Sequence, residues 1–117
     1  MKGIGIDIVE FSRIKRINQL EKFVDKILSE KEKNIYRGLV NEQRRLEYLA
    51  GRFALKEAIY KAASDLCKGK NFNEFSILNE ASGAPYLVEP EMPGIMMTLS
   101  HSENYVVAFV VDASKSF

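Results

Sequence analysis

The longest predicted helix of this 117-residue chain carries a carboxylate, Glu57, inside its apolar face. Successive helical residues lie about 100° apart, because the helix has roughly 3.6 residues per turn. This spacing puts Glu57 in the middle of an arc of otherwise apolar side chains: Leu46, Leu49, Ala50, Phe53, Ala54 and Tyr60. Arg52, Leu55 and Lys56 fall nearer the edges of the arc or on its far side.

An isolated carboxylate on a buried face is costly, so we expect a cation beside Glu57. Lys61, four residues further along, projects on the same side of the helix and is one candidate partner. A metal ion that shares Glu57 with a second carboxylate is the other. The first reading is a structural salt bridge, and the second is a functional site.

Composition predicts one domain, residues 1–117, without a strong charge bias. The 17 Lys and Arg residues against 16 Asp and Glu residues leave a net charge of +1, which gives no support for nucleic acid or an anionic membrane as a partner. Cys67 is the only cysteine, which excludes an internal disulfide framework, suits a reducing cytosol and is more typical of a packed residue than of a nucleophile.

The apolar run at residues 3–6 meets Asp7 too soon to form the core of a signal sequence. No apolar stretch approaches the roughly 20 residues of a membrane span. We therefore expect a cytoplasmic protein that is not embedded in a membrane.

The N-terminal segments predict a strand and two short helices. Isoleucines alternate with small or polar residues over positions 4–8, which predicts a short strand with one apolar face that Asp7 closes. Helical spacing with a basic outer surface follows over residues 11–20. Ser29 with Glu32 indicates a capping box that opens a second short helix through Tyr36.

The remaining segments predict an α+β fold, in which one long helix packs on a mainly antiparallel sheet. Asn41 is expected to cap the long helix, which runs to about Lys68 and ends near Gly69. Strands are expected at 75–78 and 85–88 around a turn at Ser82-Gly83. The strongest strand patterns, 95–99 and 105–111, are joined by a polar connection at 100–104.

Three polar residues stand out, and each has an ordinary structural explanation. Asp7 with Glu10 matches a helix N-cap and its capping-box partner. Glu57 with Lys61 matches a helical ion pair. His101, in a predicted turn, is more typical of a surface histidine than of a catalytic one. Spacing alone does not decide between these explanations and a shared site.

Four stretches taken together carry a family resemblance. They are Gly3 to Val9 with Arg13-Ile14; Ala50 to Ala58 with Lys61-Ala62; Gly83 to Tyr86; and Thr98 to Ser102. In this combination the sequence resembles, over essentially its full length, the holo-acyl-carrier-protein synthases, the small single-domain branch of the 4′-phosphopantetheinyl transferases. The most specific stretch is Arg-Phe-Ala-x-Lys-Glu-Ala-x-x-Lys-Ala. It lies on the predicted long helix and includes Glu57, the acid whose inward position needs an explanation.

The resemblance implies the 4′-phosphopantetheinyl transferase fold and transfer of the phosphopantetheine arm of coenzyme A to a serine of apo acyl carrier protein, with release of 3′,5′-ADP, in fatty acid biosynthesis. It implies Mg²⁺ held by Asp7 and Glu57, because magnesium binds one or two carboxylates with substrate phosphates and water. Lys61 would neutralise the leaving phosphate. The serine proton has three open routes: Glu57 directly, Glu57 through water, or metal-bound hydroxide.

The resemblance also implies a set of substrate contacts. Coenzyme A would be bound by Arg52, Phe53, Lys56, Lys61, Gly83, Pro85, Ser100, His101 and Ser102. For Gly83 and Pro85, an ordinary turn between strands is an equally good explanation. Arg13 and Arg16 would dock the acidic carrier protein, although such charges usually mark a solvated helix face. The family implies a homotrimer with active sites between subunits, in which the Gly83 to Tyr86 and His101 regions come from a neighbour.

One departure from the family pattern concerns residues 63–70. The related enzymes often have an aromatic residue and a glycine-rich loop there, whereas this segment contains Gly69 alone. The departure motivates an alternative, a coenzyme A or nucleotide-binding module without transferase activity. A third possibility is a structural subunit in which Glu57 and Lys61 form only a buried bridge.

Overall fold

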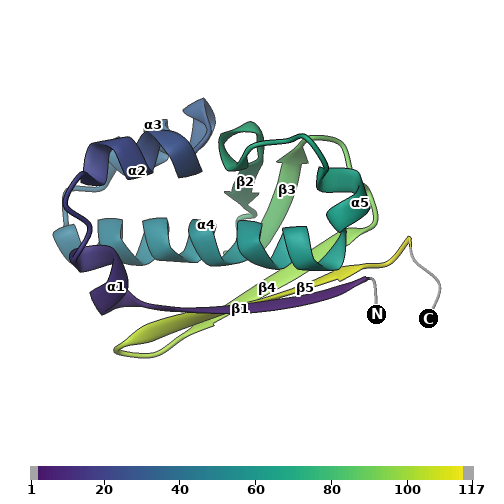
Figure 1. Cartoon of the computed structure of the whole chain (residues 1–117). Coiled ribbons are helices and arrows are strands. Elements are labelled where there is room, and N and C mark those ends of the chain that lie inside the picture. Colours follow the sequence, from purple (N-terminus) through teal and green to yellow (C-terminus); the bar gives the residue numbers. More distant parts are fainter. Residues whose placement is uncertain (1–2, 115–117) are drawn as a thin grey trace.

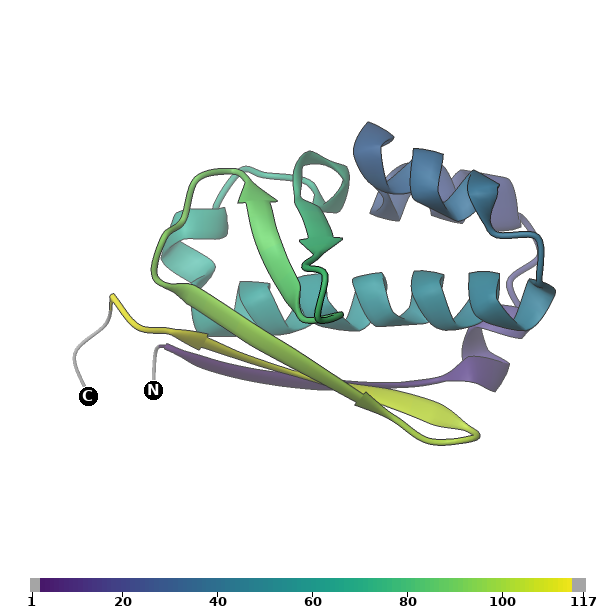
Figure 2. The same ribbon diagram turned by 180° about the vertical axis from the view of Figure 1, so that it is seen from behind.

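Helix α4, Glu42–Ala62, runs through the middle of the molecule between two layers (Figure 1). The computed structural model describes residues 3–114. On one side lies an antiparallel sheet of β1 (Ile4–Glu10), β5 (Tyr105–Asp112) and β4 (Ile95–His101), in that order. On the other side lie α2 (Leu20–Ile27), α3 (Glu30–Gly38) and a two-stranded antiparallel sheet of β2 (Ser76–Asn79) and β3 (Pro85–Glu89), as Figure 2 shows from behind. The expected α+β fold is confirmed.

Three short elements complete the chain: α1 (Phe11–Lys15), α5 (Ser64–Cys67) and the 3₁₀ helix η1 (Phe72–Glu74). The expected helix over 11–20 is therefore wrong, because helical backbone stops at Lys15 and resumes at Leu20. The long helix ends at Ala62 rather than Lys68, because Ala63 leaves the helical region with φ −137° and ψ 48°. No helix among residues 3–114 combines the length and apolar character that crossing a membrane requires.

Both predicted helix starts are confirmed. The Ser29 backbone N–H donates to Glu32 Oε1 at 2.9 Å, and the Glu32 N–H donates to Ser29 Oγ at 3.3 Å. Asn41 Oδ1 accepts from the Arg44 N–H at 3.0 Å. The capping box expected from Asp7 and Glu10 is wrong, because β1 continues through Asp7 and the N-cap of α1 is Glu10.

The burial of α4 differs from the expected single apolar face. Arg52 is 3% exposed and Lys56 is 0% exposed, whereas Glu57 is only partly buried. The prediction that Arg52 and Lys56 lie at the edge or far side of the buried arc is therefore wrong, and so is the central burial of Glu57. The reason is physical: layers pack against α4 from two sides, so its middle turns have no single solvent face.

Strand β1 approaches α4 closely at Gly5. A Cβ atom added at Gly5 would lie 2.0 Å from the Ala58 carbonyl oxygen and 2.9 Å from the Ala62 backbone nitrogen. Only a residue without a side chain fits there. The alternation of β1 then directs Gly5, Asp7 and Val9 toward the helix, while Ile4, Ile6 and Ile8 face outward.

Replacement of Gly5 by alanine tests this contact. Backbone atoms of α4 are fixed by helical hydrogen bonds, so Gly5→Ala should lower the free energy of unfolding by at least about 1–3 kcal/mol, the usual cost of overpacking. Urea denaturation measures the change. Gly38→Ala is the matched control, because an added Cβ meets nothing within 4 Å there and alanine favours the helix. Equal stability of Gly5→Ala and the unaltered chain would contradict the close approach.

Candidate active site

Asp7 and Lys61 meet where β1 packs on the C-terminal half of α4. Lys61 Nζ donates to the Ile6 carbonyl at 2.8 Å and to Asp7 Oδ1 at 3.3 Å. The Asp7 side chain is 17% exposed and that of Lys61 is 55% exposed, so the pair is open to an incoming ligand. Within residues 3–114 Lys61 is paired with Asp7, and the expected ion pair between Lys61 and Glu57 is not formed. The buried Glu57–Lys61 bridge is thereby excluded.

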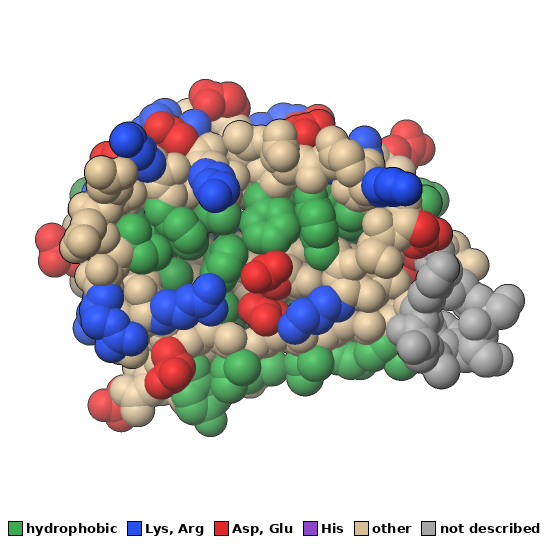
Figure 3. Space-filling model, viewed as in Figure 1, with side chains coloured by type: hydrophobic (Ala, Val, Ile, Leu, Met, Phe, Trp, Pro, Cys, Tyr) green, Lys and Arg blue, Asp and Glu red, His purple; other side chains and the backbone are tan. Residues whose placement is uncertain are grey.

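Glu57 lies one turn before Lys61 and lines a groove of about 670 Å³, which we call the aromatic groove. Its lining residues are Phe23, Lys26, Ile27, Phe53, Glu57, Tyr60, Lys70, Asn71, Phe72 and Asn73. The rings contact one another edge to face, with centroid distances of 5.4 Å for Phe23–Phe53 and 4.8 Å for Tyr60–Phe72. Figure 3 shows this side of the molecule: acidic side chains gather at its centre below an apolar surface, with Lys and Arg side chains on either side.

Two carboxylates of this kind suit magnesium. Among residues 3–114 no group of three or more His, Cys, Asp or Glu side chains could hold a metal ion by itself. Magnesium does not need such a cage, because it binds through one or two carboxylates and takes its other ligands from phosphates and water. Asp7 and Glu57 supply oxygen donors of this type from neighbouring elements. The donor set therefore fits the ion that the family resemblance implies.

A buried ion-pair network was missed in the sequence. Glu32 is fully buried, and its Oε1 accepts from Lys56 Nζ at 2.5 Å while its Oε2 accepts from the Ile77 N–H at 2.8 Å. The Arg52 guanidinium lies 4.0 Å from the same carboxylate. Burial lowers the pKa of Lys56 to about 8, against the opposing effect of the Glu32 charge. The only local signal was the capping box, which explains Glu32 without its cationic partners.

The charged groups of Lys56 and Arg52 form hydrogen bonds inside the fold. Lys56 Nζ also donates to the Ile27 and Phe72 carbonyls at 2.7 and 3.0 Å. Arg52 donates to the Ile77 carbonyl at 3.1 Å and to Asn79 Oδ1 at 2.9 Å, and its guanidinium stacks 4.6 Å from the Tyr48 ring centroid. Lys56 therefore presents no charge at the surface, which argues against its expected contact with coenzyme A.

A second groove, of about 780 Å³, collects several of the predicted coenzyme A contacts. Arg52, Gly83 and His101 line it, together with Arg44, which sequence reasoning did not single out. Its other lining residues are Ile35, Leu39, Glu47, Tyr48, Gly51, Leu78, Asn79, Tyr86 and Leu99. Arg44 and His101 are exposed basic side chains in this lining, which suits an anionic ligand, whereas Arg52 is buried and bonded inside the fold.

The remaining predicted contacts are spread over other places. Gly83 has φ +94° in the turn before Pro85, the first residue of β3, and an added Cβ would meet nothing within 4 Å. The turn alone thus accounts for this glycine. Ser100 is exposed on β4 and, by strand alternation, lies on the sheet face opposite His101. Ser102 lies in the hairpin turn, where its N–H donates to the Tyr105 carbonyl at 2.9 Å.

Arg13 of the first helix contacts a ring that lines the aromatic groove. The Arg13 guanidinium is 5.3 Å from the centroid of the Phe53 ring, a cation–π contact. Arg16 is the C-cap of α1 and is exposed.

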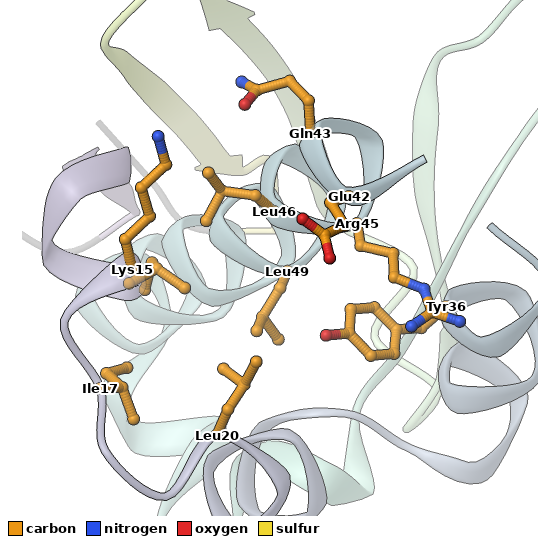
Figure 4. Close-up of a pocket in the computed structure, with 10 residues that line it drawn as sticks. Lys15, Ile17, Leu20, Tyr36, Glu42, Gln43, Arg45, Leu46 and Leu49 are labelled. Carbon is orange, nitrogen blue, oxygen red and sulfur yellow. The ribbon is translucent and has the colours of Figure 1, made fainter. Parts of the chain in front are cut away.

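A further hollow of about 610 Å³ lies between α1, α2, α3 and the start of α4 (Figure 4). The Arg45 guanidinium there donates to the Leu39 carbonyl at 2.5 Å, so this cation is used within the fold.

The glycine-poor segment 63–70 is ordered by helix and side-chain contacts. It forms α5, and Gly69 follows with φ +80°. The Tyr60 hydroxyl donates to the Lys70 carbonyl, which holds this segment beside the aromatic groove. Cys67 is buried, which confirms the packed position expected for it, and this burial raises the pKa of its thiol to about 11.

Comparisons with known proteins identify the family and the solved structures that this chain resembles. The profile of the 4′-phosphopantetheinyl transferase superfamily matches residues 3–110. The chain is 46% identical over 115 residues to the holo-[acyl-carrier-protein] synthase of Acholeplasma laidlawii, and the match covers 97% of each chain. The crystal structure of the Bacillus anthracis holo-(acyl-carrier-protein) synthase in complex with CoA (3′,5′-ADP) aligns with a TM-score of 0.79 at 38% identity, over 93% of both chains. The Helicobacter pylori enzyme in complex with coenzyme A gives a TM-score of 0.74 at 30% identity, over 92% of this chain and 97% of that one.

The chain belongs to the 4′-phosphopantetheinyl transferase superfamily. Within the superfamily, the relatives it resembles over nearly its whole length are holo-[acyl-carrier-protein] synthases. These matches confirm the resemblance inferred from the four sequence stretches, the expected fold, and the prediction that the chain is an enzyme of this type.

Removal of the Glu32 charge tests the buried network. Glu32→Gln leaves the Lys56 ammonium buried without an anionic partner, so the free energy of unfolding should fall by about 3–5 kcal/mol. Glu30→Gln is the matched control on the same helix, because Glu30 is exposed and its loss should change stability by no more than about 0.5 kcal/mol. Urea denaturation of both variants checks this, and equal effects would contradict the role of Glu32.

Proposed function

We propose that the chain transfers the 4′-phosphopantetheine group of coenzyme A to a serine of apo acyl carrier protein and releases 3′,5′-ADP. We further propose that the reaction depends on Mg²⁺, serves fatty acid biosynthesis and takes place in the cytoplasm, in a single domain of residues 1–117. The observation that carries the proposal is the Asp7–Lys61 pair beside Glu57 in a member of this family.

The chemical task is electrostatic. The serine oxygen forms a bond to the phosphorus that bears the pantetheine arm, and the bond from that phosphorus to the bridging oxygen of 3′,5′-ADP breaks. Charge builds up on the leaving phosphate. Lys61 is exposed and stands beside Asp7, so its ammonium is placed to neutralise this charge. The Ile6 carbonyl and Asp7 fix the ammonium on one side of α4.

Glu57 is the proposed acceptor of the serine proton, directly or through a water molecule. It is partly buried at the edge of the aromatic groove, one helical turn from Lys61. Asp7 and Glu57 would hold Mg²⁺, which supplies positive charge against the oxygens of the diphosphate when bound. Arg13, near the Phe53 ring, and Arg16 would meet the acidic carrier protein at the end of this groove.

We propose a homotrimer with active sites between subunits. Two observations support it. Ile4, Ile6 and Ile8 are 44%, 57% and 56% exposed on the outer sheet face, where Met96 and Phe109 are exposed as well. Figure 3 shows hydrophobic side chains along the edge of the molecule where the sheet lies. An apolar sheet face of this kind fits a second copy of the chain.

The second observation is the separation of the predicted substrate contacts. Glu57 and Phe53 line the aromatic groove, whereas Arg44, Arg52, Gly83 and His101 line the other one. A site that joins Asp7, Glu57 and Lys61 of one chain to the Gly83 to Tyr86 and His101 regions of a neighbour would use both surfaces. The alternative function, coenzyme A or nucleotide binding without transfer, is favoured only by the glycine-poor segment 63–70.

Transfer is tested by mass spectrometry of the carrier protein. The chain should convert apo acyl carrier protein with coenzyme A and Mg²⁺ to the phosphopantetheinyl form, and EDTA should stop the conversion. Asp7→Asn and Glu57→Gln should each lower the rate by about 100-fold or more, because each removes charge needed in the transition state. Glu30→Gln, on the exposed side of α3, should react at the normal rate. No metal-dependent mass gain with the unaltered chain would reject the enzyme and favour the binding module.

The trimer is tested by light scattering coupled to gel filtration. Ile6→Lys places a charge on the outer sheet face without disturbing the core, because Ile6 is 57% exposed, and it should yield monomers with little transferase activity. Val40→Lys is the matched control, since Val40 is 95% exposed in the connection between α3 and α4. A monomeric unaltered chain, or a trimeric Ile6→Lys variant, would contradict this arrangement.

A further inference from the structure

Lys61 is bound on one side by two oxygen atoms of strand β1. Its Nζ donates to the Ile6 carbonyl at 2.8 Å and to Asp7 Oδ1 at 3.3 Å. An ammonium carries three N–H groups, so one remains for a further acceptor. The Lys61 side chain is 55% exposed and its stem is flexible, so the ammonium can change partners without a change in the fold.

Asp7 needs a cation in this position. Its side chain is only 17% exposed, because Gly5 brings β1 against the backbone of α4 and strand alternation turns Asp7 toward the helix. A carboxylate that is largely withdrawn from water is costly unless a positive charge lies beside it. Within residues 3–114 the structure gives Asp7 one ion pair, the pair with Lys61.

We infer that Lys61 and the divalent cation exchange at Asp7, and that this exchange makes the metal and coenzyme A bind cooperatively. The inference rests on the proposed function. Lys61 holds the Asp7 carboxylate until the metal enters, and it then turns to the phosphate that the substrate brings. This role goes beyond neutralisation of the leaving phosphate, because the same ammonium also sets the affinity of the chain for the metal.

A count of charges explains the cooperativity. Asp7, Glu57 and Lys61, two carboxylates and one ammonium, together carry one net negative charge. A divalent cation alone reverses the sign and places the Lys61 ammonium beside a like charge, which is unfavourable at short range. The diphosphate of coenzyme A brings negative charge of its own. The ammonium then leaves Asp7 for a phosphate oxygen, and the metal keeps both carboxylates.

The test measures the affinity of the full chain for Mn²⁺, which accepts the same carboxylate ligands as Mg²⁺ and is detected by electron paramagnetic resonance. Titrations are made with and without saturating coenzyme A, in the absence of carrier protein. A titration of coenzyme A with Mn²⁺ alone supplies the correction for metal bound outside the protein. Coenzyme A should raise the Mn²⁺ affinity of the unaltered chain by about tenfold or more.

Lys61→Met removes the competing ammonium. Without coenzyme A this variant should bind Mn²⁺ about tenfold more tightly than the unaltered chain, and coenzyme A should then add little. A charge that only repels the metal from a fixed place would change both Mn²⁺ affinities by the same factor and leave the effect of coenzyme A unchanged. Lys61 is exposed, so the variant should stay folded, which urea denaturation verifies.

Lys61→Arg keeps the charge and changes only the strength of the pairing. A guanidinium binds a carboxylate through two N–H groups, so it should release Asp7 less readily than an ammonium does. Without coenzyme A this variant should bind Mn²⁺ about threefold or more weakly than the unaltered chain. Lys68→Met removes an exposed cation at the end of α5, and as the control it should change neither Mn²⁺ affinity.

Three results would overturn the exchange: an unchanged Mn²⁺ affinity of Lys61→Met without coenzyme A, an equal effect of coenzyme A on Lys61→Met and the unaltered chain, or tighter Mn²⁺ binding by Lys61→Arg. Mn²⁺ binding that stays the same in Asp7→Asn would overturn it as well, because the metal would then not use this carboxylate. Transfer to the carrier protein combined with any of the first three results would reject this inference alone. Exchange without transfer would reject the proposed enzyme alone.

Discussion

One buried carboxylate, Glu32, holds the helical layer onto the central helix. Its two oxygens accept from the capping N–H of its own helix, from a strand N–H of β2, and from the Lys56 ammonium of α4. Without this anion, Arg52 and Lys56, two buried cations one turn apart on α4, would lack a carboxylate partner, at a large desolvation cost. Lys56 of the same network bonds to the carbonyls of Ile27, at the end of α2, and Phe72, at the start of η1. Both residues line the aromatic groove, as Glu57 does. The buried Glu32–Lys56 ion pair thus supports both the fold and the candidate site.

The opposite side of α4 is set by a steric constraint. Gly5 lets β1 approach the helix backbone, and the next inward residue of the strand, Asp7, then reaches Lys61. The closeness of strand and helix places a carboxylate and an ammonium at one edge of the molecule, near the carboxylate of Glu57. The alternation that turns Asp7 inward also turns three isoleucines outward, and this apolar face supports the proposed trimer. A single strand therefore serves both the site and the proposed contact between subunits.

Local patterns in the sequence predicted much of the fold. The capping box at Ser29, the cap at Asn41 and the C-terminal hairpin are confirmed, because each depends on residues close together in the chain. The predicted buried face of α4 was wrong. A helical projection assumes one buried and one solvated face, whereas this helix packs against two layers. Glu32 and Lys56 are 24 residues apart, and no periodic pattern predicts which acid meets which base across that separation. Strand alternation would have separated Ser100 from His101, had it been applied to residues 95–101 as one strand.

Asp7 and Glu57 are proposed to hold one divalent cation beside the diphosphate of coenzyme A. The most direct measurement is a crystal structure of the chain with coenzyme A and Mn²⁺, which accepts the same carboxylate ligands as Mg²⁺ and has an anomalous scattering signal. We expect a single anomalous peak within bonding distance of a carboxylate oxygen of each residue and of a diphosphate oxygen. A peak bound by only one of the two acids, or located away from the diphosphate, would contradict it.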